Sequence, residues 1–460
     1  MKVFVAMQQE RSRMLGEMPM SRLIPQVSVP IMISMLVQAL YNVVDSIFVA
    51  KFDANALTAV SLAFPIQQLM IALSTGLGVG INSLISRKLG ERNPEEARQA
   101  AKNGLMLEAA GSVLFMIVGL FFSPLLLRFF TPDETLRELG TTYLTIVCTV
   151  SMGLFMSITL ERMLQATGNT VCSMAVQLSG AVVNIILDPI MIFGWFGLPA
   201  MGIAGAAWAT VIGQLFSMLL GFYLNQKKNA ELKLNRHGWK PKWRMMSGIL
   251  TVGLPSTVMA SIGSVLVVLM NLLLIQFGNV AVSVLGVYFK LQSFVFMPVF
   301  GLSNGMVPIV GYNYGARSRK RVYGAVKVAL IYAFVIMVVG MLLFLLVPET
   351  LMSFFEADGP SELTTHGVPA LQIISISFPL AAIGITLGTV FQAVGKGGYS
   401  LLMSLCRQLV VLLPVAWILA KVGGLVAIWW SFPIAEVVSV TLCLLLYRKC
   451  DRELLRPLDK

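Results

Sequence analysis

Charged residues are scarce in this sequence. Asp, Glu, Lys and Arg together make up 12% of the 460 residues, whereas hydrophobic residues make up 57%. Soluble domains carry about 25% charged residues, so a soluble globular protein is excluded. The chain is therefore predicted to be an integral membrane protein.

Histidine and cysteine are also rare, with two and five residues. No Cys/His cluster has metal-ligand spacing, so we expect no zinc site. The sequence lacks H-E-x-x-H and G-x-S-x-G motifs, so we expect neither enzyme activity nor a cofactor. The cysteines lie in apolar runs or just past the last run, where cysteine typically acts as a small hydrophobic residue: Cys148, Cys172, Cys406, Cys443 and Cys450.

Apolar runs recur along nearly the whole chain, and each is long enough to cross a hydrocarbon core of about 30 Å as a helix. The first twenty residues are of mixed polarity and end in no A-x-A-like site, so we expect no cleaved signal peptide. We predict an all-α protein with twelve transmembrane helices, at residues 24–50, 56–86, 104–127, 141–164, 171–196, 202–224, 248–276, 281–311, 325–347, 369–392, 399–420 and 425–447.

The net charge of +12 is distributed unevenly between the two faces of the predicted membrane protein. If the N-terminus is cytoplasmic, the cytoplasmic segments hold 28 of the 34 Lys and Arg residues and the opposite face holds 4. This bias follows the positive-inside rule, so both termini are predicted to be cytoplasmic and no nucleic-acid partner is needed to explain the charge. We expect a monomer in the cytoplasmic (inner) membrane of a bacterium or an archaeon.

The sequence repeats itself. An offset of 225 residues aligns 30–92 with 255–317 without a gap, and QATGNTVCS (165–173) recurs as QAVGKGGYS (392–400). Each half holds six spans, so both enter the membrane in the same orientation and are related by a pseudo-two-fold axis along the membrane normal, as in alternating-access transporters. The predicted units are an N-terminal lobe (1–225), a basic cytoplasmic linker (226–246) and a C-terminal lobe (247–460).

The segment RNPEEARQ (92–99) carries the signals of a helix start. Asn93 can cap a helix whose first position is Pro94, and Glu96 is placed to complete a capping box. The segment is predicted to be structural.

Charged side chains at membrane depth cost at least about 2.5 kcal/mol on insertion scales, so each requires a partner, a water-filled cavity or a function. Asp188 lies in NIILDP, four residues after Asn184 and therefore on the same helix face. Pro189 supplies no backbone N–H and so frees carbonyl groups near the acid. Such a group of oxygens suits a small hard cation or a shared proton.

Asp45 is the second acid of this kind, and depth estimates place it near Asp188. Asp45 lies about 31 Å and Asp188 about 26 Å from the cytoplasmic start of their spans, and Thr210 lies about 14 Å from the outer surface. At matching positions the C-terminal half has apolar residues, so the predicted site belongs to the N-terminal half alone.

Other polar groups in the spans are assigned less definite roles. Glu161 and Arg162 lie near a span end and are expected to snorkel to the interface. In the C-terminal half, Glu436 is expected to pair with Arg407 or to be solvated in the cavity, in preference to a coupling role, and Lys290 either lines the cavity or forms a buried pair. The cavity between the halves is predicted to be lined by Gln38, Tyr41, Asn42, Phe64, Gln67, Phe289, Lys290 and Gln292.

Several stretches are similar to one known family. LYNVVDSIFVA (40–50), GNT (168–170) followed by NIILDPI, GIAGAAWAT (202–210) and the duplicated halves resemble the multidrug and toxic compound extrusion (MATE) family, in particular its prokaryotic DinF-like branch. The resemblance covers the chain after its first twenty residues. It implies a cation-linked site, for Na⁺ or H⁺, in the N-terminal lobe, and a first helix that bends at Pro30. The family's site residues match Asp45, Asn184, Asp188 and Thr210.

These observations predict an antiporter that exports organic, cationic and amphipathic compounds in exchange for Na⁺ or H⁺. Asp, Asn and Thr serve either ion, so the sequence leaves the coupling ion open. Lys290 and Arg407 keep one alternative open, a lipid-linked oligosaccharide flippase of the same superfamily, because a flippase needs cationic groups for pyrophosphate. The expected partners are small organic cations or drugs and the lipid bilayer.

Overall fold

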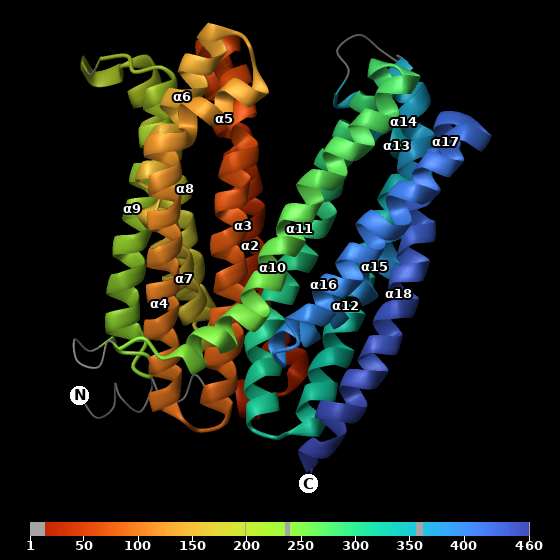
Figure 1. Cartoon of the computed structure of the whole chain (residues 1–460). Coiled ribbons are helices and arrows are strands. Elements are labelled where there is room, and N and C mark those ends of the chain that lie inside the picture. The colour runs from red at the N-terminus through yellow and green to blue at the C-terminus, as the bar shows by residue number, and fades with distance from the viewer. Residues whose placement is uncertain (1–13, 198, 235–239, 356–361, 460) are drawn as a thin grey trace.

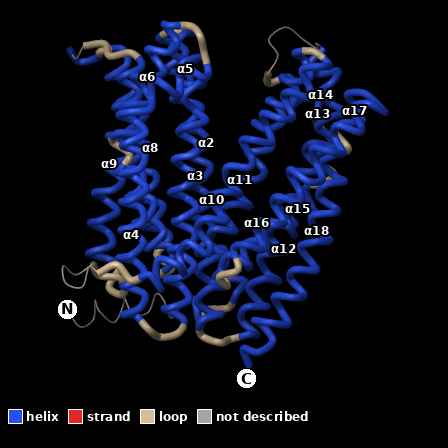
Figure 2. Tube along the Cα trace, in the orientation of Figure 1, coloured by secondary structure: helices blue, strands red, loops and turns tan. Residues whose placement is uncertain are grey.

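A computed structural model describes residues 14–197, 199–234, 240–355 and 362–459 of the chain. Every regular element in these ranges is helical (Figures 1 and 2). The helices gather into two bundles, as expected for a chain whose apolar runs must satisfy their own backbone hydrogen bonds in lipid.

The N-terminal bundle contains the six spans of the first half. Two of them are interrupted: α4 passes through the π-helical turn η1 into α5, and α6 is followed at an angle by α7. The helices are α2 (Met20–Phe52), α3 (Ala54–Gly90), α4 (Pro94–Ile117), η1 (Val118–Phe122), α5 (Ser123–Phe130), α6 (Glu134–Thr149), α7 (Met152–Ala166), α8 (Thr170–Phe193) and α9 (Ile203–Lys228).

The C-terminal bundle follows the same order. Its fourth span is again two helices at an angle, and its fifth contains the π-helical turn η4. The helices are α10 (Trp243–Leu274), α11 (Asn279–Gly315), α12 (Arg319–Leu346), α13 (Pro348–Ser353), α14 (Glu362–Ser375), α15 (Phe378–Ala393), α16 (Gly397–Leu405), η4 (Cys406–Leu412), α17 (Leu413–Ile428) and α18 (Ser431–Cys450).

The predicted number of spans is confirmed when each angled pair is counted as one. Ten of the described helices are long and apolar enough to cross a membrane, and the pairs α6–α7, bent by 46°, and α14–α15, bent by 50°, bring the total to twelve. Some boundaries differ from the prediction. The third span begins at Pro94 instead of 104, because its first turns are amphipathic and escape a hydropathy criterion.

The predicted helix start at Asn93 is confirmed. The Asn93 side chain accepts a hydrogen bond from the backbone N–H of Glu96 at 3.1 Å, and Pro94 occupies the first turn. The Glu96 carboxylate instead forms an ion pair with Lys88 on α3, at 2.7 Å. The loop is therefore attached to two helices.

Both ends of the described chain are bound to the start of α12. Arg321 donates to the carbonyl groups of Leu15 and Met18, and the Tyr323 hydroxyl donates to Asp451. The end of the molecule at which α2 begins and α18 ends, the lower end in Figure 1, is called the N/C end below.

Glycines that the repeat aligns join the two bundles near the N/C end. An added Cβ on Gly76 or Gly80 of α3 would overlap Thr257 or Ile249 of α10, and one on Gly301 or Gly305 of α11 would overlap Met32 or Ser28 of α2. At the helix ends, Gly90 lies against the Tyr312 backbone and Gly315 against the Arg87 backbone. Thr257 follows Met32 by 225 residues and Tyr312 follows Arg87 by 225, so the α3–α10 and α2–α11 seams are copies of one contact.

Away from the N/C end the bundles diverge (Figure 1). Gly263 on α10 and Gly286 on α11 lie nearer the opposite end, and an added Cβ at either would meet nothing within 4 Å. The interface therefore closes at the N/C end only.

Candidate functional site

Two of the predicted site residues project from α8 into the N-terminal bundle. Asn184 is 2% exposed and Asp188 is completely buried. They lie one turn apart, so the Asn184 amide reaches the Asp188 carboxylate: Nδ2 donates to Oδ2 at 3.0 Å when the amide oxygen faces the backbone N–H of Thr210. That N–H donates to the amide oxygen at 3.0 Å.

Thr210 lies on α9, and small residues bring this helix close to α8. An added Cβ on Gly213 would lie 2.7 Å from the Gly180 carbonyl oxygen and 3.2 Å from the Asn184 Cβ. Gly205 packs against the Met191 backbone in the same way. The α8–α9 seam therefore fixes the distance between Asn184 and Thr210. Thr210 itself is 4% exposed.

The first helix supplies the second carboxyl group. Asp45 on α2 lies within hydrogen-bonding reach of the Asp188 carboxyl group. Its Oδ1 atom is buried and has no hydrogen-bond partner among the described residues. One turn earlier, the Tyr41 hydroxyl lies beside the Thr210 hydroxyl. The structure thus brings Asp45, Asn184, Asp188 and Thr210 together from three helices.

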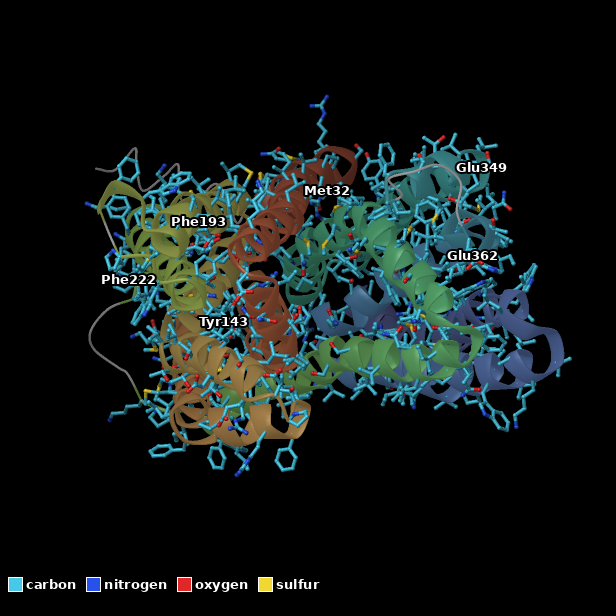
Figure 3. All side chains as sticks on the ribbon, turned by 90° about the horizontal axis from the view of Figure 1, so that it is seen from above. Met32, Tyr143, Phe193, Phe222, Glu349 and Glu362 are labelled. Atoms are coloured by element: carbon cyan, nitrogen blue, oxygen red, sulfur yellow. The ribbon has the colours of Figure 1, made fainter. Side chains whose placement is uncertain are left out.

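Two neutral polar residues lie near this cluster. Tyr143 on α6 is 3% exposed and its hydroxyl donates to Oε1 of Gln67 on α3 at 3.5 Å. The field of Asp45 and Asp188 acts on Tyr143, which Figure 3 labels within the N-terminal bundle. Tyr143 was not identified from the sequence, where a tyrosine in an apolar run gives no signal of its own.

The chemistry of the cluster is that of an acid pair. Two carboxylates in contact repel each other unless a proton or a cation lies between them. The available oxygens are carboxylate, amide and hydroxyl, which are the ligands that hard cations prefer. The arrangement can therefore hold one shared proton or one small cation.

The other predicted cavity residues are spread over several environments. Gln38 accepts a hydrogen bond from Gln177 of α8 at 2.7 Å, and Phe64 is 53% exposed. Phe289 packs against Tyr288, with ring centroids 5.4 Å apart, and Gln292 is half-buried. The side chain of Asn42 lies outside the described residues. These residues come from both bundles, and their lining of one common cavity stays a prediction.

The basic residues of the C-terminal bundle have distinct neighbours. Arg407, in the π-helical turn η4, donates to Oε2 of Glu436 on α18 at 3.3 Å, which agrees with the predicted pair. Lys290 is exposed, and its ammonium group lies 5.8 Å from the centre of the Phe355 ring. No ion pair to Lys290 occurs among the described residues.

The charges near the end of α7 share one buried neighbour. Arg162 donates to Gln165, and Gln165 donates to Glu161; Gln165 is completely buried, whereas Glu161 and Arg162 are partly exposed. Glu108 on α4, a completely buried carboxyl group, was missed altogether. It lies near the N-terminal edge of the predicted third span, where its charge had no neighbouring motif.

Two parallel six-span bundles with a polar site in the membrane interior define a secondary transporter fold. A family model described as MatE matches residues 30–190 and again 255–418, so the chain belongs to the multidrug and toxic compound extrusion (MATE) family.

Among its relatives is the multidrug export protein MepA of Staphylococcus haemolyticus (strain JCSC1435), 28% identical over 418 residues, with 91% of each chain covered. One similar structure is described as the outward-facing conformation of a multidrug resistance MATE family transporter of the MOP superfamily; it is 26% identical, covers 98% of each chain and has a TM-score of 0.90. Another, described as MATE in the bent conformation, is 26% identical, covers 98% of this chain and 99% of the other, and has a TM-score of 0.90.

Proposed function

We propose that this protein is an antiporter that exports organic, cationic and amphipathic compounds in exchange for Na⁺ or H⁺. The observation that carries the proposal is the contact between the Asp45 and Asp188 carboxyl groups beside Asn184 and Thr210. A group of this kind changes its charge when it binds a cation and is costly to keep ionised in lipid. Multidrug export by the relatives supports the substrate class.

The N/C end is proposed to face the cytoplasm, because the predicted cytoplasmic segments hold 28 of the 34 basic residues. With the bundles joined at this end and diverging at the other, the conformation is outward-facing. Ion binding alters α2, which carries Pro30 and Asp45, and so favours one arrangement of the bundles.

The membrane potential supplies enough energy for this exchange. Each elementary charge that crosses the full field releases about 2.3 kcal/mol per 100 mV. Every 1.4 kcal/mol corresponds to a tenfold ratio, so two ions exchanged for one monovalent cation, a net transfer of one charge, drive an accumulation of roughly tenfold to a hundredfold.

Ethidium efflux from a pump-deficient bacterium tests the proposal. Asp45→Asn should abolish coupled efflux while the protein still inserts into the membrane, because an amide cannot take up a proton or neutralise Na⁺. Asp53→Asn is the matched control, since Asp53 is an exposed helix cap whose role an asparagine can fill. Normal efflux by well-expressed Asp45→Asn protein would contradict the proposal.

Proteoliposomes separate the two ions and the alternative function. Ethidium transport driven by a sodium gradient at constant pH identifies Na⁺, and transport driven by a pH gradient without sodium identifies H⁺. Failure of both gradients, together with movement of a lipid-linked oligosaccharide between leaflets, would favour the flippase instead.

A further inference from the structure

Glu108 is a second buried acid of the N-terminal bundle, separate from the Asp45–Asp188 pair. It lies on α4, its exposed fraction is 0%, and neither carboxyl oxygen has a hydrogen-bond partner among the described residues. Buried polar groups are almost always paired, so an unpaired carboxyl group requires an explanation.

Hydroxyl groups and a positive charge face Glu108 from the helices that pack on α4. Ser74 of α3 and Thr159 of α7 place hydroxyls beside it, and Arg162 of α7 acts on it through its charge. The Ser74 hydroxyl and the Arg162 Nε are themselves buried without a partner. Three helices therefore point unpaired polar atoms into one small region.

This region can stabilise either form of the acid. The Thr159 hydroxyl donates to the Phe155 carbonyl at 3.0 Å, which leaves its oxygen free to accept a hydrogen bond from the O–H of protonated Glu108. An ionised Glu108 would instead accept from the Ser74 hydroxyl and be balanced by Arg162. A structural acid needs suitable neighbours for only one form, whereas suitable neighbours for both forms lie beside Glu108.

Polar side chains continue from this region toward the N/C end. Arg162 donates to Oε1 of Gln165 at 2.8 Å, and the Gln165 amide donates to Glu161 at 2.7 Å and to the Ser173 hydroxyl at 3.0 Å. Ser173 lies in the first turn of α8, which begins at the N/C end. The series ends at Glu161, a residue that is partly exposed.

Toward the opposite end, one apolar turn separates Glu108 from the Asp45–Asp188 site. Gln67, which accepts from Tyr143, and Ser74 lie seven residues apart on the same face of α3, or about 10 Å. Met70, completely buried, lies between them. Met70 therefore interrupts the polar side chains that follow this face of α3 from one site toward the other.

The repeat shows that the fold itself does not need this acid. At an offset of 225 residues Glu108 corresponds to Ala333 on α12, which is also completely buried. Ser74 corresponds to Val299 in the same way. At the equivalent place in the C-terminal bundle, an alanine and a valine therefore replace the acid and the serine.

We propose that Glu108 is a second proton-binding site, which takes up and releases one proton between the Asp45–Asp188 pair and the N/C end in each transport cycle. The proton moves between the Glu108 carboxyl group and Glu161 through water, with Arg162 and Gln165 ordering that water; no other bond changes. The inference rests on the proposed antiport, for which it selects H⁺ as a coupling ion.

Infrared difference spectroscopy on the purified full-length protein tests the binding site directly. We compare spectra at about pH 5 and about pH 9, which span the ordinary range of perturbed carboxyl groups. The Glu108 band, defined as the protonated-carboxyl band that is absent in Glu108→Gln, should titrate in the wild type and remain in Glu436→Gln, the membrane-embedded control. A Glu108 band present at both pH values, or at neither, would overturn the proposal.

Glu108→Asp keeps a carboxyl group and should retain a titrating band, which guards against a folding defect in the glutamine variant. In proteoliposomes, Glu108→Gln should slow ethidium uptake driven by a pH gradient by about a hundredfold, the usual value of a positioned proton carrier. Ethidium exchange without a gradient should persist; its loss in well-folded Glu108→Gln would contradict a role confined to proton transfer.

The two proposals fail differently. A wild-type protein that does not carry ethidium contradicts the antiport, whereas the infrared titration of Glu108 does not depend on any substrate. Asp45→Asn should lose transport and keep the Glu108 band. Loss of that band in Asp45→Asn would show that the two acids are one site and would overturn the inference.

Discussion

Asp188 illustrates how a single residue can be both predictable and costly. Its position before Pro189 and one turn after Asn184 is visible in the sequence, and the structure places it completely out of solvent. Its hydrogen bond comes from Asn184, whose amide oxygen is held by α9. Asn184, a neutral residue, therefore organises the site, because it joins the Asp188 carboxylate to the backbone N–H of Thr210.

Thr210→Val tests the hydroxyl without disturbing this arrangement, because the Asn184 amide oxygen accepts from the backbone N–H of Thr210. We expect the concentration of coupling ion needed for half-maximal transport to rise about fivefold to tenfold, and stability to fall by no more than about 1 kcal/mol. Transport kinetics in proteoliposomes measure the first, and thermal unfolding the second. Thr142→Val, at an exposed threonine of α6, is the control and should behave as wild type.

The Arg407–Glu436 pair gives a second residue-scale prediction. Arg407→Gln leaves Glu436, whose side chain is 8% exposed, without its cation, and should lower the free energy of unfolding by about 1–3 kcal/mol. The double variant Arg407→Gln/Glu436→Gln should recover most of this loss, since no buried charge then remains. A double-mutant cycle from unfolding in detergent measures the coupling, and additive effects would contradict it.

The residues found from the sequence were those with local partners. Asp45 and Asp188 interrupt apolar runs beside Asn, Tyr or Pro, so each gave a pattern. Glu108 has no polar neighbour within its own helix turn; its partners Ser74, Thr159 and Arg162 come from α3 and α7. Such a site depends on tertiary packing, which one sequence read along its length does not reveal.

At the scale of helices, contact between α8 and α9 decides whether the candidate site forms. Gly180, Gly205 and Gly213 let the two backbones approach, and Asn184 and Thr210 lie across the same seam. In a membrane such small residues replace the hydrophobic effect as the basis of helix association.

Gly213→Val should force α8 and α9 apart and separate Asn184 from Thr210. The added Cβ alone would lie 2.7 Å from the Gly180 oxygen, so we expect a loss of about 1–3 kcal/mol in stability and a strong reduction of coupled transport. Gly286→Val on α11 places the same side chain in open space and is the control. Equal transport by the two variants would show that the seam does not set the site.

Helix number was predictable because hydrophobic length is a property of each segment alone. Helix shape was less so. The bend of 46° in the fourth span follows no proline at the break between α6 and α7, whereas Pro379 lies in the first turn after the 50° bend of the tenth span. The sequence predicted each of them as a single span. The sequence predicted a helix start at Asn93 and Pro94, but it did not predict that this helix continues into the third span.

At the scale of the molecule, two equivalent seams hold the bundles together. The aligned glycines of α3 and α11 each meet the partner bundle through a backbone or a small side chain. Because both seams lie toward the N/C end, an inward-facing arrangement requires that both open.

Gly80→Val and Gly305→Val should therefore have matching effects. Each should keep the N/C end from closing, so that spin labels at residues 92 and 318 lie farther apart than in the wild type, by several ångströms. Gly263→Val, where an added Cβ meets nothing, should leave the distance unchanged. A wild-type distance in both seam variants would show that the glycines are not required for closure.

The equivalence of the seams has a consequence for how such a protein can arise. In an isologous dimer, residue i of one subunit contacts residue j of the other, and residue j of the first contacts residue i of the second. The two halves of this chain show the same pairing between residues that the repeat aligns. Met32 with Gly301 and Thr257 with Gly76 obey this rule. A gene for one half would thus have encoded a subunit whose two copies already fitted each other, and fusion of the copies left each free to change separately, so that an acid kept in one became an alanine in the other.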